Sequence, residues 1–224
     1  MKLPDATSGD RHEADRRLHS PEERYGARLS QRGSSVVLQE RLAARERQSL
    51  DEALSRVVDD GSAVAVASAI VAARRRFITG RGKSLAYATL LASDLSAGLS
   101  LVTLLDDAVV RAVDILSEVR ATDVLIAFSM RRYRRDTVEL CRQFVKAGGT
   151  VLAITDDADS PVADIAAVSV VVSTESASYA DSPTAVAAVS HIIATLATAS
   201  SKGARRRLSE QDRITRELGI YLDD

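Results

Sequence analysis

The chain of 224 residues has the length of one domain, or of one domain with an appendage. Its hydrophobic share of 46 % and charged share of 27 % are typical of a globular protein. Thirty basic residues face 31 acidic ones, and the formal net charge of −1 argues against broad nucleic-acid or membrane binding. Aromatic residues make up 4 % and Trp is absent, which argues against a stacking platform for single strands.

Cysteine and histidine are too few for a disulfide or a structural zinc site. Cys141 is the one cysteine, and the histidines are His12, His19 and His191. The N-terminus has no apolar run after a basic start, and no stretch of 18 apolar residues occurs, so neither a secretory signal nor a membrane span is expected. We therefore expect a cytoplasmic protein with no membrane partner, no metal and no cofactor.

The N-terminal residues 1–36 differ from the rest of the chain. They hold seven basic and six acidic residues without apolar periodicity, which predicts a flexible or partly helical leader and not a basic DNA-binding arm. From Leu38 to Val57 leucines and valines recur at helical spacing. An Asp-Asp-Gly break follows, and Ser62 is expected to cap a second helix that runs to about Ala73.

Strands and helices then alternate. Strands are predicted at 76–80, 101–105, 123–129, 150–155 and 168–172, and helices at 84–97, 108–119, 137–147, 182–199 and 204–218. The helix at 108–119 is expected to carry Val109 and Val113 on its apolar side. This order predicts an α/β protein, a three-layer α/β/α sandwich with a flavodoxin-like five-stranded parallel sheet. Ligands of such sheets bind at the carboxyl ends of the strands.

The first strand ends in Gly80-Arg81-Gly82-Lys83-Ser84. It is not a P-loop, because Phe77 stands where that motif needs its first glycine, and it is not a dinucleotide fingerprint, because Leu85 stands at the third glycine. A glycine loop that opens a helix attracts an anion such as a phosphate. The alternative is a tight strand-to-helix turn without a ligand.

The third strand ends in a loop at 129–137 that contains Ser129, four arginines and Thr137. Both hydroxyls can donate to one phosphate, and the arginines can supply charge, although a solvated surface loop is the alternative for most of them. After the fourth strand, Ser160-Pro161 is expected to start a short helix, and a hydroxyl-rich loop at 173–184 is expected to line the same crevice.

Together these segments resemble the SIS (sugar isomerase) domain, in the version carried by RpiR-type regulators, over about Leu38 to Ala199. The resemblance implies binding of a phosphosugar, with Ser84, Ser129 and Thr137 holding the phosphate. Gly80, Gly82, Lys83 and Arg131 belong to the same two loops and complete the predicted site. The usual third-loop pattern is Ser-x-Ser-Gly-x-Thr, and this sequence departs from it with Arg131 at the second serine and Tyr133 beyond it.

The resemblance divides the chain into a leader (1–36), a SIS domain (37–200) and a C-terminal amphipathic helix (201–224). RpiR-type regulators also carry a helix-turn-helix domain, which needs some 40 patterned residues. The leader is too short for it, so DNA binding is expected only through a missing or separate domain. Because SIS domains commonly pair, a homodimer or tetramer is expected.

An isomerase needs an acid or base beside the sugar. Glu175 is the best candidate for a catalytic carboxylate, although a solvated loop residue is the alternative. Glu139 is expected to face solvent, and His191 is expected to lie in the core or an interface. Without an acid–base pair the sequence favours a phosphosugar sensor over a sugar-phosphate isomerase or lyase. A scaffold that pairs through the helices at 38–57 and 204–218 is compatible with either.

Overall fold

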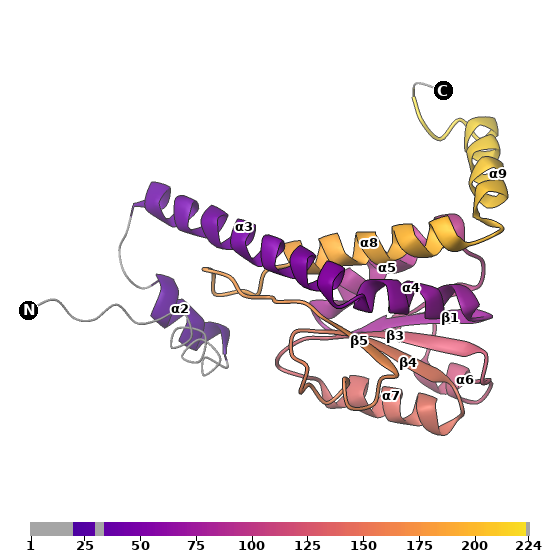
Figure 1. Ribbon diagram of the computed structural model, residues 1–224, viewed down its shortest axis with the longest axis horizontal. Helices are drawn as coiled ribbons and strands as arrows, with labels where there is room; N and C mark the ends of the chain where they lie inside the picture. Colours follow the sequence, from indigo (N-terminus) through magenta and orange to yellow (C-terminus); the bar gives the residue numbers. More distant parts are fainter. Residues whose placement is uncertain (1–19, 30–33, 223–224) are drawn as a thin grey trace, which may run out of the picture.

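The computed structural model describes residues 20–29 and 34–222 (Figure 1). Within them the strands are β1 (Arg75–Gly80), β2 (Val102–Leu105), β3 (Asp123–Ser129), β4 (Thr150–Thr155) and β5 (Val168–Val171). The helices are α2 (Pro21–Leu29), α3 (Ser35–Asp59), α4 (Ser62–Ala72), α5 (Ser84–Gly98), α6 (Ala112–Leu116), α7 (Arg135–Lys146), α8 (Thr184–Ser200) and α9 (Ala204–Glu217). His12 and His19, with most of the predicted leader, lie outside the described residues.

The strands form one parallel sheet in the order β2-β1-β3-β4-β5. The chain leaves β1 toward one edge and β3 toward the other, so the strand order reverses between these two strands. All seven residues of β3 are buried, as expected of a central strand with both faces covered. The predicted flavodoxin-like parallel sheet is confirmed.

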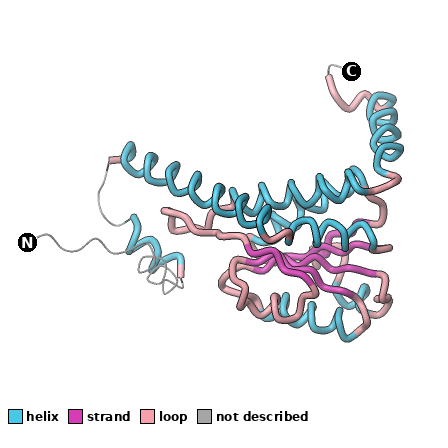
Figure 2. Tube along the Cα trace, viewed as in Figure 1, coloured by secondary structure: helices cyan, strands magenta, loops and turns pink. Residues whose placement is uncertain are grey.

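Helices cover both faces of the sheet, which makes three layers (Figures 1 and 2). Helices α3, α4, α5 and α8 pack on one face around a large apolar cluster that includes Ile70, Leu91 and Ile193. Helices α6 and α7 pack on the other face around a smaller cluster that includes Phe144 and Leu125. The predicted α/β/α sandwich is therefore confirmed.

Two arginines fasten the start of β1. The Arg75 guanidinium pairs with the fully buried carboxylate of Asp123 at the start of β3, with Nη2 2.6 Å from Oδ2. Arg76 is buried and donates from Nε to the carbonyl of Ile70 at 2.7 Å and from Nη2 to that of Val71 at 3.1 Å. A cation at the C-terminal end of α4 stabilises that helix, so these two arginines serve the fold.

Three local predictions were wrong. The segment 108–119 is helical only in α6, because Asp106 Oδ1 accepts bonds from the N–H groups of the three residues 108–110 at 3.0–3.2 Å and holds them in a turn. Val109 and Val113, expected on an apolar face, are 82 % and 73 % exposed. Ser160-Pro161 begins a series of turns rather than a helix.

The third wrong prediction concerns Ser62. The residue before α4 is Gly61, which has a φ of +66°, and no side chain caps this helix. The Ser62 N–H donates to Asp60 Oδ1 at 2.8 Å, whereas its hydroxyl is buried without a partner among the described residues. A left-handed residue, which glycine adopts at low cost, thus makes the sharp change of direction between α3 and α4.

Helix α9 turns away from the body of the molecule, at 105° to α8 (Figure 1). It touches α5 through Arg207 Nε, which donates to the Ser96 carbonyl at 3.0 Å, and it buries Ala204. In the described part of the chain no single helix is long and apolar enough to cross a membrane, and only the bent pair α8–α9 passes that test, by length and composition alone.

Candidate functional site

The candidate site lies where the strand order reverses. Gly80 at the end of β1 is opposite Phe128 in β3, so the two strands end side by side. Helix α5 leaves on one face of the sheet and α7 on the other. The loops therefore diverge and leave a crevice, the usual ligand position in such sheets. A cavity of about 290 Å³ occupies this crevice.

The two glycines of the first loop are required by its shape. A Cβ on Gly80 would lie 2.3 Å from the backbone oxygen of Ser84. Gly82 has a φ of +58°, which a residue with a side chain rarely adopts. Together they turn the chain sharply enough to place Lys83 and Ser84 on the wall of the cavity.

Backbone amides of this loop are largely used within the turn. The N–H groups of Ser84, Leu85 and Ala86 donate to the carbonyls three residues earlier at 3.1–3.2 Å. An anion at this helix start would therefore depend on the Ser84 hydroxyl, on nearby cations and on the helix dipole more than on these three amides.

Three buried residues that carry hydroxyl groups line the cavity. Ser84 is at the start of α5, Ser129 ends β3, and Thr137 lies in the first turn of α7. They are 8 %, 4 % and 2 % exposed and all line the cavity. Within the described part of the chain their hydroxyls make no hydrogen bond. Buried polar groups normally have partners, so these three donors are available to a ligand.

The cavity is strongly positive. Six basic side chains and one acidic side chain line it among the described residues; they are Arg24, Arg81, Lys83, Arg131, Arg132, Arg134 and Asp181. Such an excess of one sign in a concave site attracts an anion. Most of these cations also have carboxylate neighbours, because Arg81 pairs with Asp107 and Arg134 pairs with Asp136.

Arg131, in the loop after β3, is bound to Asp156, which directly follows β4. Its backbone N–H donates to Asp156 Oδ1 at 3.1 Å, and its side-chain Nε lies 3.6 Å from Oδ2. Burial raises the pKa of Asp156. Burial and this carboxylate also raise the pKa of Tyr133. The arginine and tyrosine that replace the usual third-loop residues thus gather around one buried acid.

The loop at 173–184, expected to line the crevice, reaches the cavity through Thr174 and Asp181. Sequence reasoning missed Tyr87 and Arg24, which also lie on the cavity wall. The Tyr87 hydroxyl is buried without a partner among the described residues, and burial together with the Asp181 charge raises its pKa to about 12. Its position one helical turn after Ser84 could have indicated it, because residues three apart share a helix face. Arg24 comes from a distant segment, and no local pattern points to it.

Glu175, the predicted catalytic candidate, is not among the cavity-lining residues. Its carboxylate pairs with Arg45 of α3, and its carbonyl accepts a bond from Ser49 Oγ at 3.2 Å. Glu139 is exposed on α7, in agreement with the prediction. His191 does not lie in the core, because its side chain is 76 % exposed, with Nδ1 3.9 Å from Asp94 Oδ2.

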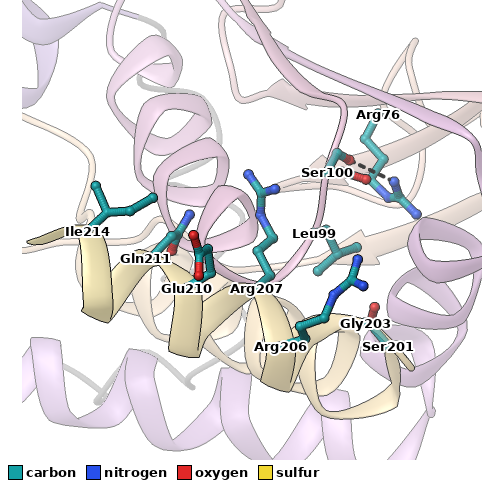
Figure 3. A pocket seen from close by; sticks show the side chains of 11 residues that line it. Arg76, Leu99, Ser100, Ser201, Gly203, Arg206, Arg207, Glu210, Gln211 and Ile214 are labelled. Carbon is teal, nitrogen blue, oxygen red and sulfur yellow. Dashed lines mark hydrogen bonds between the residues drawn. The ribbon is translucent and has the colours of Figure 1, made fainter.

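A larger cavity of about 630 Å³ lies near the amino ends of β1 and β2, between α9 and the end of α5 (Figure 3). Arg206 and Arg207 reach toward it from α9, and Arg76 donates to the Ser100 carbonyl beside it at 3.0 Å. Arg76 already serves the end of α4, and the amino ends of strands are not the usual ligand position. We therefore place the candidate site in the smaller cavity. The described residues contain no group of His, Cys, Asp and Glu placed to hold a metal ion.

Comparison with known proteins gives a family and a fold for this chain. The family model of the SIS domain matches residues 69–201. No curated protein matches the chain significantly. Among solved structures, the sugar isomerase domain of an RpiR transcription factor from Sphaerobacter thermophilus is 28 % identical, with a TM-score of 0.72 over 79 % of this chain and 98 % of that one.

Two further structures have a similar fold. The Vibrio vulnificus NanR protein, complexed with ManNAc-6P, is 16 % identical, with a TM-score of 0.65 over 82 % of this chain and 73 % of that one. A hypothetical protein from Methanococcus jannaschii, for which the function of a 3-hexulose-6-phosphate isomerase was inferred, is also 16 % identical, with a TM-score of 0.56 over 78 % and 94 % of the two chains.

Proposed function

This chain is a member of the SIS domain family, and on that premise we propose that it is a sensor that binds a phosphorylated sugar between β1 and β3. The observation that carries the proposal is a positive cavity lined by three buried hydroxyl residues whose hydroxyls have no partners among the described residues. The complex of NanR with ManNAc-6P supports the same ligand class.

The phosphate fits the end of the cavity at the two loops. A phosphate group presents three acceptor oxygens, and Ser84, Ser129 and Thr137 offer three hydroxyl donors. Lys83 supplies a positive charge beside them. The sugar would then extend toward Tyr87, whose hydroxyl can bond a sugar hydroxyl.

A sensor suits this wall better than an isomerase does. Asp181 is the one carboxylate in the described lining, and it is bonded to Arg24. Glu175 is held outside the cavity by Arg45. Proton transfer between adjacent sugar carbons needs a carboxylate or imidazole within reach of the substrate. An isomerase or lyase that uses Glu175 would require this residue to leave Arg45 and turn inward.

Sensing implies an output, which we propose to be regulation of sugar metabolism, as in RpiR-type regulators. We propose that the chain acts as a homodimer or tetramer, supported by the exposed apolar residues Leu208 and Ile214 on α9 and Leu218 directly after it. Contact with DNA would run through a separate domain or chain.

Thermal-shift measurements with a panel of aldose and ketose phosphates test the ligand class. Binding of a member of the panel should raise the midpoint of unfolding in the wild type, and Ser129→Ala should reduce the shift strongly. Ser93→Ala, on the exposed face of α5, is the matched control and should leave the shift unchanged. Absence of a shift with every sugar phosphate, or equal shifts in wild type and Ser129→Ala, would refute the proposal.

Turnover separates the sensor from the isomerase. NMR spectra of the same sugar phosphates incubated with the protein should show no interconversion. Interconversion that is abolished by Glu175→Gln would establish the isomerase instead.

A further inference from the structure

Helix α2 lies outside residues 69–201, which match the SIS domain, and yet it reaches the cavity. Pro21 and Arg24 of α2 both line the cavity. Helix α9, in contrast, lies at the opposite end of the molecule (Figure 1). The Arg24 side chain is only 9 % exposed. A guanidinium so enclosed in the wall of an anion site is placed to bind the anion itself.

Polar contacts hold α2 in place. Arg24 pairs with Asp181, and Arg28 Nη1 donates to the Ser178 carbonyl at 2.6 Å. Both partners belong to the loop between β5 and α8. Arg24 is the one buried residue of α2, and Arg41 of α3 donates from Nη2 to the Arg28 carbonyl at 2.6 Å. The contacts of α2 with the described residues are therefore mainly polar, and exchange of the Arg24–Asp181 pair changes how this helix is held.

Asp181 is unusual in this cavity, because it is the one acidic side chain that lines it among the described residues. Its carboxylate bonds Arg24, and its backbone carbonyl accepts from Lys83 Nζ. It also contributes to the raised pKa of Tyr87. The Asp181 carboxylate therefore pairs with Arg24, the cation that an entering phosphorylated ligand would bind, and its negative charge repels that ligand.

We propose that Arg24 is a ligand-binding residue supplied by α2, and that Asp181 is the counter-ion which the bound ligand's phosphate replaces. Arg24 then exchanges an internal carboxylate for a dianionic group that it can bind with two parallel hydrogen bonds. Ligand binding in this way changes the anchor of α2 and passes the state of the cavity to the segment before α3. This inference rests on the proposed phosphosugar function.

Affinity measurements test the role of Arg24. The probes are inorganic phosphate and the sugar phosphate that gives the largest thermal shift in the wild type. Arg24→Gln should weaken binding of the sugar phosphate about 10-fold or more, as expected for loss of a charged hydrogen bond. Arg24→Lys, which keeps the charge, should have an affinity between those of the wild type and Arg24→Gln. Asp181→Asn should bind the sugar phosphate more tightly than the wild type. Arg142→Gln, at an exposed arginine of α7 outside the cavity, is the matched control and should leave affinity within about twofold.

Hydrogen exchange of the α2 amides tests the replacement of Asp181. In Asp181→Asn the protection of α2 should fall without ligand and return when the sugar phosphate is added. In Arg24→Gln protection should be low with and without ligand. A merely structural Arg24 would leave the affinity unchanged, and a merely structural Asp181 would leave α2 unprotected in both states.

The outcomes separate this inference from the proposed function. If the wild type binds the sugar phosphate through Ser129 and Arg24→Gln binds it equally well, only the inference on α2 is overturned. It is also overturned if the ligand fails to restore protection in Asp181→Asn. If the wild type binds neither phosphate nor any sugar phosphate, both proposals fail.

Discussion

Replacing Gly80 by alanine should disrupt the turn that carries Lys83 and Ser84. The added Cβ would lie 2.3 Å from the backbone oxygen and 2.6 Å from the carbonyl carbon of Ser84. Cβ atoms essentially never approach a heavy atom within 3.0 Å, so the turn must open by at least 0.7 Å, the difference between 3.0 and 2.3 Å. Because the neighbours are backbone atoms, the first turn of α5 has to move.

The cost follows from the rigidity of these neighbours. Overpacking in a closely packed region costs about 1–3 kcal/mol, and a contact with backbone at a helix start belongs in the upper half of that range. For a chain of this size, about 2–3 kcal/mol lowers the midpoint of thermal unfolding by about 4–12 °C. Because Ser84 moves, Gly80→Ala should also weaken sugar-phosphate binding by the protein that remains folded, which is an effect separate from the loss of stability.

Urea unfolding and titration with the sugar phosphate measure the two effects in Gly80→Ala. Gly203→Ala is the control, because Gly203 has a φ of −97° and a Cβ there would meet no atom within 4 Å. Its stability should stay within about 0.5 kcal/mol of the wild type. If Gly80→Ala is as stable as Gly203→Ala and binds the ligand normally, the assignment of this turn as the rigid support of the site is wrong.

Three further predictions concern groups whose partners or burial are known. Tyr87 has its pKa raised to about 12 by burial and by Asp181, whereas the unfolded phenol titrates near 10. The folded protein should therefore lose roughly 2–3 kcal/mol of stability from this residue as pH rises from 10 to 12, and urea unfolding of Tyr87→Phe should show a smaller loss over that interval. Burial raises the pKa of Cys141 to about 12, so its thiol should resist iodoacetamide at pH 8 in the native state and react on unfolding, as mass spectrometry would show. Rapid native alkylation would contradict the placement of this residue in the core. Glu175→Gln removes the charged partner of Arg45 and should lower the free energy of unfolding by about 1–3 kcal/mol without changing ligand affinity. A loss of affinity with unchanged stability would instead place Glu175 at the ligand.

The central strands of this fold could be predicted from the sequence because both of their faces are buried, which requires continuous apolar residues. In β3 and β4 the apolar runs are continuous and end at polar residues, so the predicted limits 123–129 and 150–155 match the observed ones. The first and third loops were located for the same reason, since each follows such a strand directly. Ser84, Ser129 and Thr137, to which the resemblance assigned the phosphate, line one cavity.

Features that depend on competing local bonds were harder to predict. The apolar residues of 108–119 fit a helix, but the bonds from Asp106 to three successive N–H groups favour a turn over the first part of that segment. His191 lies among apolar neighbours in the sequence and still faces outward. The pairing of Arg24 with Asp181 joins segments 157 residues apart, and periodicity within one helix or loop carries no information about such a contact.

The net charge of −1 does not show that the arginines of the cavity are paired with carboxylates of different exposure. Asp107 and Asp136, which pair with Arg81 and Arg134, are about half exposed, so either carboxylate can return to water when its arginine turns to a ligand. Asp156 is 2 % exposed, and releasing Arg131 would leave a buried carboxylate without its cation. Arg131 therefore shapes the loop, and its positive charge stays beside Asp156. The arginines with exposed partners, together with Arg24, are the ones free to exchange a carboxylate for a phosphate.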